Sequence, residues 1–428
     1  IEQMGGFSEM IREYRAMPNR NNAESGRLRP SDVLLFVYLC ALFAHRTGIG
    51  LDYYLLRGSF VFYVIVSFFL DVLPVETGRC KGKENGKLIS RLLVWFSVFV
   101  FFVYLSVFWS ESLSNTMAAN YITNFLQGFF IVAFISFRVQ KKEDLLLVIK
   151  IVVYAAFYGV VVLFLKTPLS SWGTERVGDA IGLNSNTVGL SAAFATMFCL
   201  FLSRNTKRPL YYLLAAVFIV VALFSGSRKA LFFVLAGIVL ILSFSHKGFK
   251  GLAAAILSIV IAAIIVWAIM NVPALYDVLG YRVDKLLGNV GYDGSAAERA
   301  WYRSYAREMF LDSPIVGYGF NGFLSEMQRI GYWHQAYCHC NQWELLADLG
   351  AIGFALYYSI FIMIGKGFVS KIKTNGANSL FGLIMLLLIF ASDYGYVSFM
   401  GVDIYLYITL LFCLEKMLVL KREEPCLK

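Results

Sequence analysis

The chain has 428 residues, of which 59% are hydrophobic and only 15% are charged. A soluble domain usually carries about a quarter charged residues, and a soluble chain of this length usually divides into two or three domains. Here the apolar residues form blocks of roughly 17–25 residues, the length of a helix that crosses a bilayer. The composition excludes an ordinary soluble enzyme and predicts an all-α, polytopic membrane protein.

The net charge of +10 would suggest a nucleic-acid partner only if the basic residues clustered on a soluble surface. They lie in short loops between apolar blocks, so they indicate membrane topology, and we expect no nucleic-acid partner. The seven cysteines show no spacing typical of disulfides or zinc sites.

In chain order, residues 1–30 are polar and predict a cytoplasmic arm without a cleavable signal peptide. Nine spans are expected within residues 31–271 and three within 344–420, separated by an external loop at 272–343 and followed by a cytoplasmic tail at 421–428. The twelve predicted spans are 32–50, 55–73, 89–110, 117–137, 144–165, 184–203, 209–224, 229–245, 250–271, 344–364, 378–397 and 400–419.

Basic residues gather in every second connection. These connections are 79–87, 138–142, 204–208, 247–250, 366–373 and the residues after 420. With twelve spans they all fall on one side, which the positive-inside rule identifies as the cytoplasm. Both termini are then internal, and the loop at 272–343 faces outside.

The external loop contains most of the soluble-like sequence. Alternating aromatic, charged and aliphatic residues in Ala296–Phe310 predict an amphipathic helix. Pro314 disfavours helix at the residue before it, so the helix should end there.

Several arginines fall on this external side, including Arg176, Arg228 and Arg299. A guanidinium group binds phosphate through two hydrogen bonds and stays charged at any working pH. These arginines are therefore candidates for phosphate binding. The alternative is that they are solvated loop charges or anchors at lipid headgroups.

At these residues the sequence resembles the O-antigen ligase and O-antigen polymerase family of bacterial envelope enzymes. The resemblance covers about residues 170–365 and consists of four short pieces in order. They are Arg176 with Gly178 and Asn184–Asn186, then Ser225–Arg228, then Glu298–Trp301 with Asp312–Gly319, and last His339 with Gly350 and Gly353. The family usually has an amide or a small hydroxyl residue directly after the histidine, whereas Cys340 stands here.

The resemblance implies transfer of a glycan from a polyprenyl-pyrophosphate carrier to an acceptor hydroxyl. It implies His339 as the general base, because histidine titrates near neutrality. Arg176 and Arg299 would clamp the pyrophosphate, with Arg228 as a third cation. Arginines would then replace a divalent metal, so we expect no metal and no cofactor.

Simpler readings of the same residues stay open. His339 could be an interfacial hydrogen bonder, and Cys338-His339-Cys340 could hold a metal, although successive side chains point apart. Ser227 could cap the next helix, and Gly350 and Gly353 could permit close helix packing. Finally, Glu344 and Asp348 lie one helical turn apart near His339 and could orient it.

Three functions compete. A surface polysaccharide polymerase would use another lipid-linked glycan as acceptor, and this reading is slightly favoured. A ligase would use a different acceptor, such as lipid A-core. A twelve-span transporter would show two related halves and a long central connection, but the large loop here is off-centre. For either enzyme, the expected partners are the lipid-linked donor, a glycan or lipid-linked acceptor and the bilayer. The expected location is the bacterial inner membrane, with the active site on the periplasmic face.

The predicted orientation can be tested with single cysteines in a cysteine-free background. A membrane-impermeant thiol reagent applied to intact cells or spheroplasts should label Asp293→Cys, in the external loop, and should not label Lys83→Cys, in a cytoplasmic loop. The reverse pattern would contradict the topology.

Overall fold

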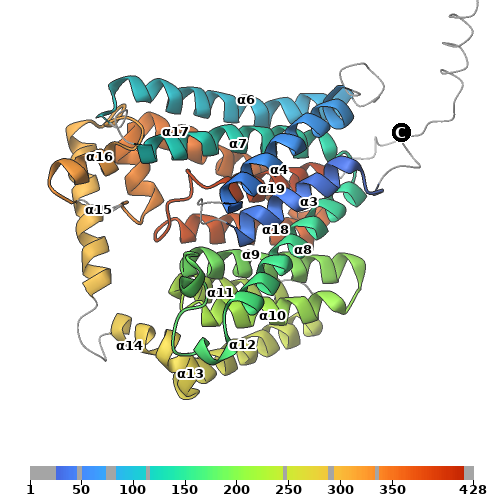
Figure 1. The fold of residues 1–428 in the computed structure, drawn as a ribbon. Coiled ribbons are helices and arrows are strands. Elements are labelled where there is room, and N and C mark those ends of the chain that lie inside the picture. Colours follow the sequence, from blue (N-terminus) through green and yellow to red (C-terminus); the bar gives the residue numbers. More distant parts are fainter. Residues whose placement is uncertain are drawn as a thin grey trace, which may run out of the picture.

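The computed structural model describes residues 26–45, 51–73, 83–111, 116–243, 248–287, 294–332 and 337–418 (Figure 1). These residues are helical, and their only strand-like pairing is one isolated bridge between Trp172 and Glu175. The all-α prediction is therefore confirmed. Most of the expected N-terminal arm and the expected tail lie outside the described residues.

Each of the twelve predicted spans overlaps a helix of the described chain. These helices are α3 (Pro30–Ala44), α4 (Leu51–Ser67), α6 (Lys83–Ser106), α7 (Thr116–Arg138), α8 (Lys142–Lys166), α9 (Ser185–Thr206), α10 (Leu210–Phe224), α11 (Arg228–Ser243), α12 (Gly248–Asn271), α17 (Asn341–Ser370), α18 (Ile372–Ser392) and α19 (Val402–Met417). Short 3-10 or π segments occur at Phe68–Val72, Val107–Trp109, Leu169–Ser171, Asp179–Ile181 and Tyr276–Gly280.

Seven segments of the described chain are long and apolar enough to cross a bilayer unaided. They are Leu51–Val72, Arg91–Trp109, Lys142–Lys166, Ser185–Thr206, Gly251–Asn271, Asn341–Ser370 and Ile372–Ser392. The apolar helices α3 and α10 and residues Ile122–Arg138 of α7 are shorter. The chain is therefore a multi-pass membrane protein, while the count of twelve crossings stays a prediction.

Helix α19 runs through the middle of the bundle (Figure 1), and its residues from Val402 to Glu415 are buried. Its aromatic rings join helices that are distant in sequence. The ring of Tyr405 lies 4.5 Å from that of Phe96 on α6, and the ring of Tyr407 lies 4.1 Å from that of Phe194 on α9. Aromatic packing on α19 therefore connects α6 with α9.

A buried ion-pair cluster ties α3, α7 and α8 together. Arg138 is 3% exposed, and its guanidinium lies 2.8 Å from the carboxylate of Asp32 and 2.9 Å from that of Asp144. The sequence shows Arg138 only as a basic residue of the 138–142 connection and gives no sign of this buried pairing. Removing one member of such a cluster usually costs about 3–5 kcal/mol, because it leaves a buried charge uncompensated.

The segment between α12 and α17 forms four further helices. They are α13 (Pro273–Leu275), α14 (Tyr281–Leu287), α15 (Gly294–Asp312) and α16 (Gly322–Arg329). The predicted amphipathic helix is α15, and it ends before Pro314 as expected. All four helices lie at the same end of the bundle, and α15 extends from α14 towards α16 and α17 (Figure 1).

Helix α17 is interrupted at Gly350, where the segment between α12 and α17 packs against it. Gly350 has a φ of +61°, and a Cβ there would lie 2.3 Å from the carbonyl oxygen of Ile315. At this break the Tyr318 N–H donates to Ala347 O (2.9 Å), and the Ala351 N–H donates to Pro314 O (2.9 Å). Gly350 therefore lets the backbone of residues 314–318 hydrogen-bond directly to the backbone of α17. These two backbones lie closer together than those of two packed helices.

Candidate functional site

His339 lies in the short segment that leads into α17. The backbone there is fixed on both sides of the histidine, because the Cys338 N–H donates to Glu344 Oε2 (2.6 Å) and the Asn341 N–H donates to Asp393 O (2.7 Å). His339 itself has a φ of +57°, in the left-handed region. That conformation costs an L-residue roughly 1–2 kcal/mol, and such outliers are common at functional sites.

Asn341 fastens this segment to the loop between α18 and α19. Its amide nitrogen donates to the Tyr358 hydroxyl (2.9 Å) and to Asp393 Oδ2 (3.3 Å). Its amide oxygen accepts from the backbone N–H groups of Ser398 (2.8 Å) and Phe399 (2.9 Å). The side chain is fully buried. The amide after the histidine therefore orders the site, one position later than in the family pattern.

The imidazole of His339 is held by aromatic rings. Its centroid lies 3.8 Å from the ring of Tyr337 and 6.2 Å from that of Tyr302, which is nearly parallel to it. The Tyr302 hydroxyl donates to Glu298 Oε1 (2.9 Å), so the acid of the Glu298–Trp301 motif supports this ring. Nδ1 of His339 is buried and has no hydrogen-bond partner among the described residues.

Burial lowers the pKa of His339 to about 3, and the positive charges of Arg299, Lys229 and Arg303 lower it as well. The imidazole is therefore neutral at physiological pH and can accept a proton. The same charges make the site favourable for an anion.

A cavity of about 270 Å³ lies among these cations, and we call it the cationic cavity. Five of its lining side chains are cationic, and the described lining includes no Asp or Glu. The lining residues are Asn186, Arg228, Lys229, Tyr281, Arg282, Lys285, Gly294, Ser295 and Arg299.

Arg176 lies beside the cationic cavity. Its Nη2 donates to Asn186 Oδ1 (3.0 Å), and its Nε donates to the carbonyl of Ser225 (2.9 Å). Burial lowers the pKa of Arg176, and the charges of Arg282 and Arg299 lower it further. The three arginines predicted from sequence are therefore brought close to one another, with Arg228 and Arg299 lining the cavity directly.

A glycine turn positions these cations. Gly226 has a φ of +63°, and a Cβ there would lie 2.8 Å from Val278 O. The Gly226 carbonyl accepts from Arg282 Nη1, and the Arg282 carbonyl accepts from Arg228 Nη1, each at 3.2 Å. Ser227 Oγ accepts from the Ala230 N–H (3.4 Å), so its interpretation as a helix cap is confirmed.

Sequence reasoning did not select Lys229, Arg282, Lys285 or Arg303 as site residues. Arg303 had a readable signal, because it lies four residues after Arg299 and so shares its helix face. Its guanidinium lies 5.0 Å from the centre of the Tyr394 ring, on the loop after α18. Arg282 and Lys285 have no comparable signal, because tertiary packing alone brings α14 to the cavity.

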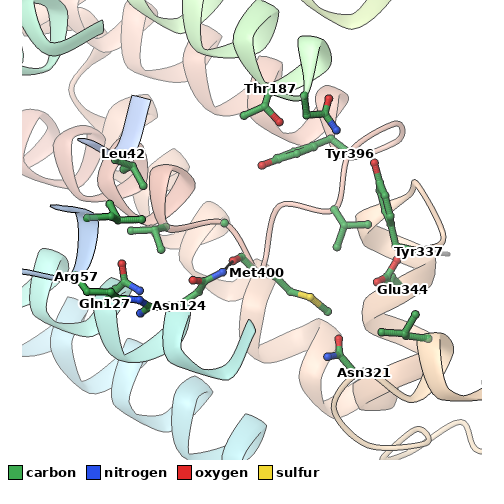
Figure 2. A pocket seen from close by; sticks show the side chains of 16 residues that line it. Leu42, Arg57, Asn124, Gln127, Thr187, Asn321, Tyr337, Glu344, Tyr396 and Met400 are labelled. Atoms are coloured by element: carbon green, nitrogen blue, oxygen red, sulfur yellow. Dashed lines mark hydrogen bonds between the residues drawn. The ribbon is translucent and has the colours of Figure 1, made fainter. Parts of the chain in front are cut away.

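A second cavity, of about 350 Å³, lies among the side chains drawn in Figure 2. Its polar lining residues include Arg57, Asn124, Gln127, Asn321, Tyr337 and Glu344. We call it the amide cavity. It adjoins the site closely, because Tyr337 packs on His339 and the lining residue Tyr396 lies 5.9 Å from Lys229 Nζ. His339 lines neither cavity itself, but it contacts Tyr337 of the amide cavity and feels the charges of Arg299 and Lys229 of the cationic cavity.

The described residues contain no group of three or more His, Cys, Asp or Glu side chains that could hold a metal. Cys338 and Cys340 are both buried, and their Sγ atoms approach Tyr302 O and Gln342 Oε1 respectively. Metal-independent action stays a prediction.

Residues 213–358 match the sequence model of a family described as O-antigen ligase. The matched range contains Arg228, Arg282, Arg299 and His339, whereas Arg176 precedes it. The resemblance seen in the sequence is thereby confirmed. No curated protein matches the chain.

The depressed pKa of His339 can be measured by NMR of histidine-labelled protein, since the chain has four histidines. The resonance that disappears in His339→Gln should not titrate between pH 8 and 5. An unfolded histidine takes up its proton near pH 6.5, so burial of this ring should also destabilise the fold as the pH falls below that value. A midpoint near 6.5 for the folded protein would contradict the described environment.

Proposed function

We propose that this chain is a membrane glycosyltransferase that transfers a glycan from a polyprenyl-pyrophosphate carrier to an acceptor hydroxyl, and the match of residues 213–358 to an O-antigen ligase family supports this. We favour a surface polysaccharide polymerase, in which the acceptor is another lipid-linked glycan. A ligase would use the same site with a different acceptor. The reaction would take place at the periplasmic face of the bacterial inner membrane and would need no metal.

The donor pyrophosphate would occupy the cationic cavity. Arg228, Arg282 and Arg299 line it, and Arg176 reaches it through Asn186. Hydrogen bonds from guanidinium groups to phosphate are charge-assisted and shorter than neutral ones. These groups are held in place before the substrate arrives, so they can stabilise charge as it develops on the leaving group.

His339 would act as the base. Its neutral imidazole accepts the proton of the acceptor hydroxyl while the hydroxyl oxygen attacks the anomeric carbon of the donor. The bond between that carbon and the pyrophosphate oxygen breaks, and its electron pair stays on the pyrophosphate. The pyrophosphate offsets the charge of Arg299, which would raise the pKa of His339 and make it a stronger base in the donor complex.

One observation carries this proposal. A neutral histidine with a buried Nδ1 feels the charges of Arg299 and Lys229, which line a cavity with five basic side chains, and it packs on Tyr337, which lines a second polar cavity. Two cavities that flank one base suit a reaction with two substrates. A transporter would require one path through the bundle and gives no reason for this arrangement.

Substitutions should separate the two roles. His339→Ala should lower the transfer rate about 10²–10⁴-fold, because the base is lost, while binding of the donor persists. Arg299→Ala should weaken donor binding as well as turnover, and Arg299→Lys should restore it only in part, because an ammonium group lacks the planar fork. The measurement is glycan transfer and donor affinity for purified variants in nanodiscs.

Arg307→Ala is the matched control, because Arg307 is an exposed arginine on the same helix. It should leave transfer and donor affinity unchanged. Near-normal turnover by His339→Ala would show that the base lies elsewhere. Transfer to a lipid-linked repeat unit would support the polymerase, whereas transfer only to lipid A-core would indicate the ligase.

A further inference from the structure

The amide cavity lies between the N-terminal helices and the catalytic segment. Arg57 on α4 and Asn124 and Gln127 on α7 gather at one end of it, and Tyr337 and Glu344 lie at the other end (Figure 2). The Tyr337 ring packs on His339, with 3.8 Å between the ring centroids. A volume of about 350 Å³ is within the usual range for a small-molecule site. A ligand that filled this cavity would reach from α4 to the histidine.

Arg57 is an unusual lining residue for a cavity inside a helix bundle. Its Nη2 donates to Thr123 Oγ1 (3.0 Å), and its guanidinium lies 5.5 Å from the Tyr53 ring. Its Nε is buried and has no hydrogen-bond partner in the described chain, and no described carboxylate pairs with it. A partly buried charge of this kind is costly unless an anion offsets it.

Asn321 provides a second, independent sign of a ligand. It is 3% exposed, its side chain lines the cavity, and its Nδ2 has no hydrogen-bond partner among the described residues. Gln127 is equally buried, and its amide oxygen already accepts from the Tyr38 hydroxyl (3.1 Å). The cavity therefore offers the Arg57 guanidinium and the Asn321 amide as donors, while Glu344 and the Asn124 amide oxygen can accept hydrogen bonds.

We infer that the amide cavity binds the acceptor glycan and that Arg57 recognises a carboxylate on an acidic sugar residue of that glycan. The inference rests on the proposed function, since it assigns the second cavity beside His339 to the second substrate. Amide side chains suit the hydroxyl groups of a sugar ring, and the guanidinium fork suits a planar carboxylate. The acidic group lies at the Arg57 end, and the reacting hydroxyl lies at the His339 end.

Simple glycosides test this assignment on the full-length protein in nanodiscs. Methyl β-D-glucuronide, methyl β-D-glucoside and methyl β-D-glucoside 6-phosphate differ in the group at carbon 6 and serve as probes in ligand-observed NMR. The glucuronide should bind better than the other two. Arg57→Gln should weaken its binding roughly tenfold or more, as expected for a lost charge-assisted hydrogen bond, and Arg57→Lys should weaken it less.

A second variant guards against a folding defect in Arg57→Gln. Asn321 has a φ of +56°, which aspartate also tolerates, so Asn321→Asp should fold. It replaces a donor with a carboxylate and should weaken glucuronide binding more than glucoside binding. Arg307→Gln, on the exposed face of α15, should change neither.

Donor binding separates a failure of this inference from a failure of the proposed function. Arg57→Gln should bind a polyprenyl pyrophosphate normally, and Arg299→Gln should bind it weakly. Absent glucuronide binding, equal binding of glucuronide and glucoside, a preference for the phosphate probe, or insensitivity to both Arg57→Gln and Asn321→Asp overturns the inference alone. Normal donor binding by Arg299→Gln contradicts the proposed function instead.

Discussion

Five basic side chains meet at one end of the helix bundle, and the rest of the site depends on how their charges are held apart. Arg228, Lys229, Arg282, Lys285 and Arg299 line a single cavity. Backbone carbonyls orient three of the nearby guanidinium groups, since Arg176 donates to Ser225 O, Arg228 to Arg282 O and Arg282 to Gly226 O. These carbonyls fix the orientation of the guanidinium groups by hydrogen bonding, and they carry no net negative charge. Asp179, 4.0 Å from Arg176, offsets part of the charge, and a polyphosphate ligand in the cavity would offset more of it.

The charges of Arg299 and Lys229 also lower the pKa of His339. Because burial and nearby cations depress its pKa, His339 is neutral but a weak base before the donor binds. An anion in the cationic cavity would reverse part of this effect. Donor binding would then prepare the base, and the acceptor in the amide cavity would react only when the donor is present. Asn341 and the break at Gly350 keep the histidine between the two cavities, because they fasten its segment to neighbouring backbone.

Much of this arrangement could be predicted from sequence, and the rest could not for physical reasons. Long apolar blocks predict the helices because a bilayer requires them, and the spaced motifs contain His339, Arg228 and Arg299. The buried pairing of Arg138 with Asp32 and Asp144 could not be predicted, because a basic residue in a connection looks the same in the sequence whether it is solvated or paired. Arg282 and Arg57 depend on tertiary packing, which brings α14 to α11 and α4 to α7 without a local sequence pattern.

The central claim is that the cationic cavity holds the donor pyrophosphate beside His339. A cryo-EM structure of the protein in nanodiscs with a polyprenyl pyrophosphate tests this most directly. We expect density for both phosphates in the cationic cavity, between Arg228, Arg282 and Arg299. Phosphate density elsewhere, or phosphates bridged by a metal ion away from these arginines, would contradict it.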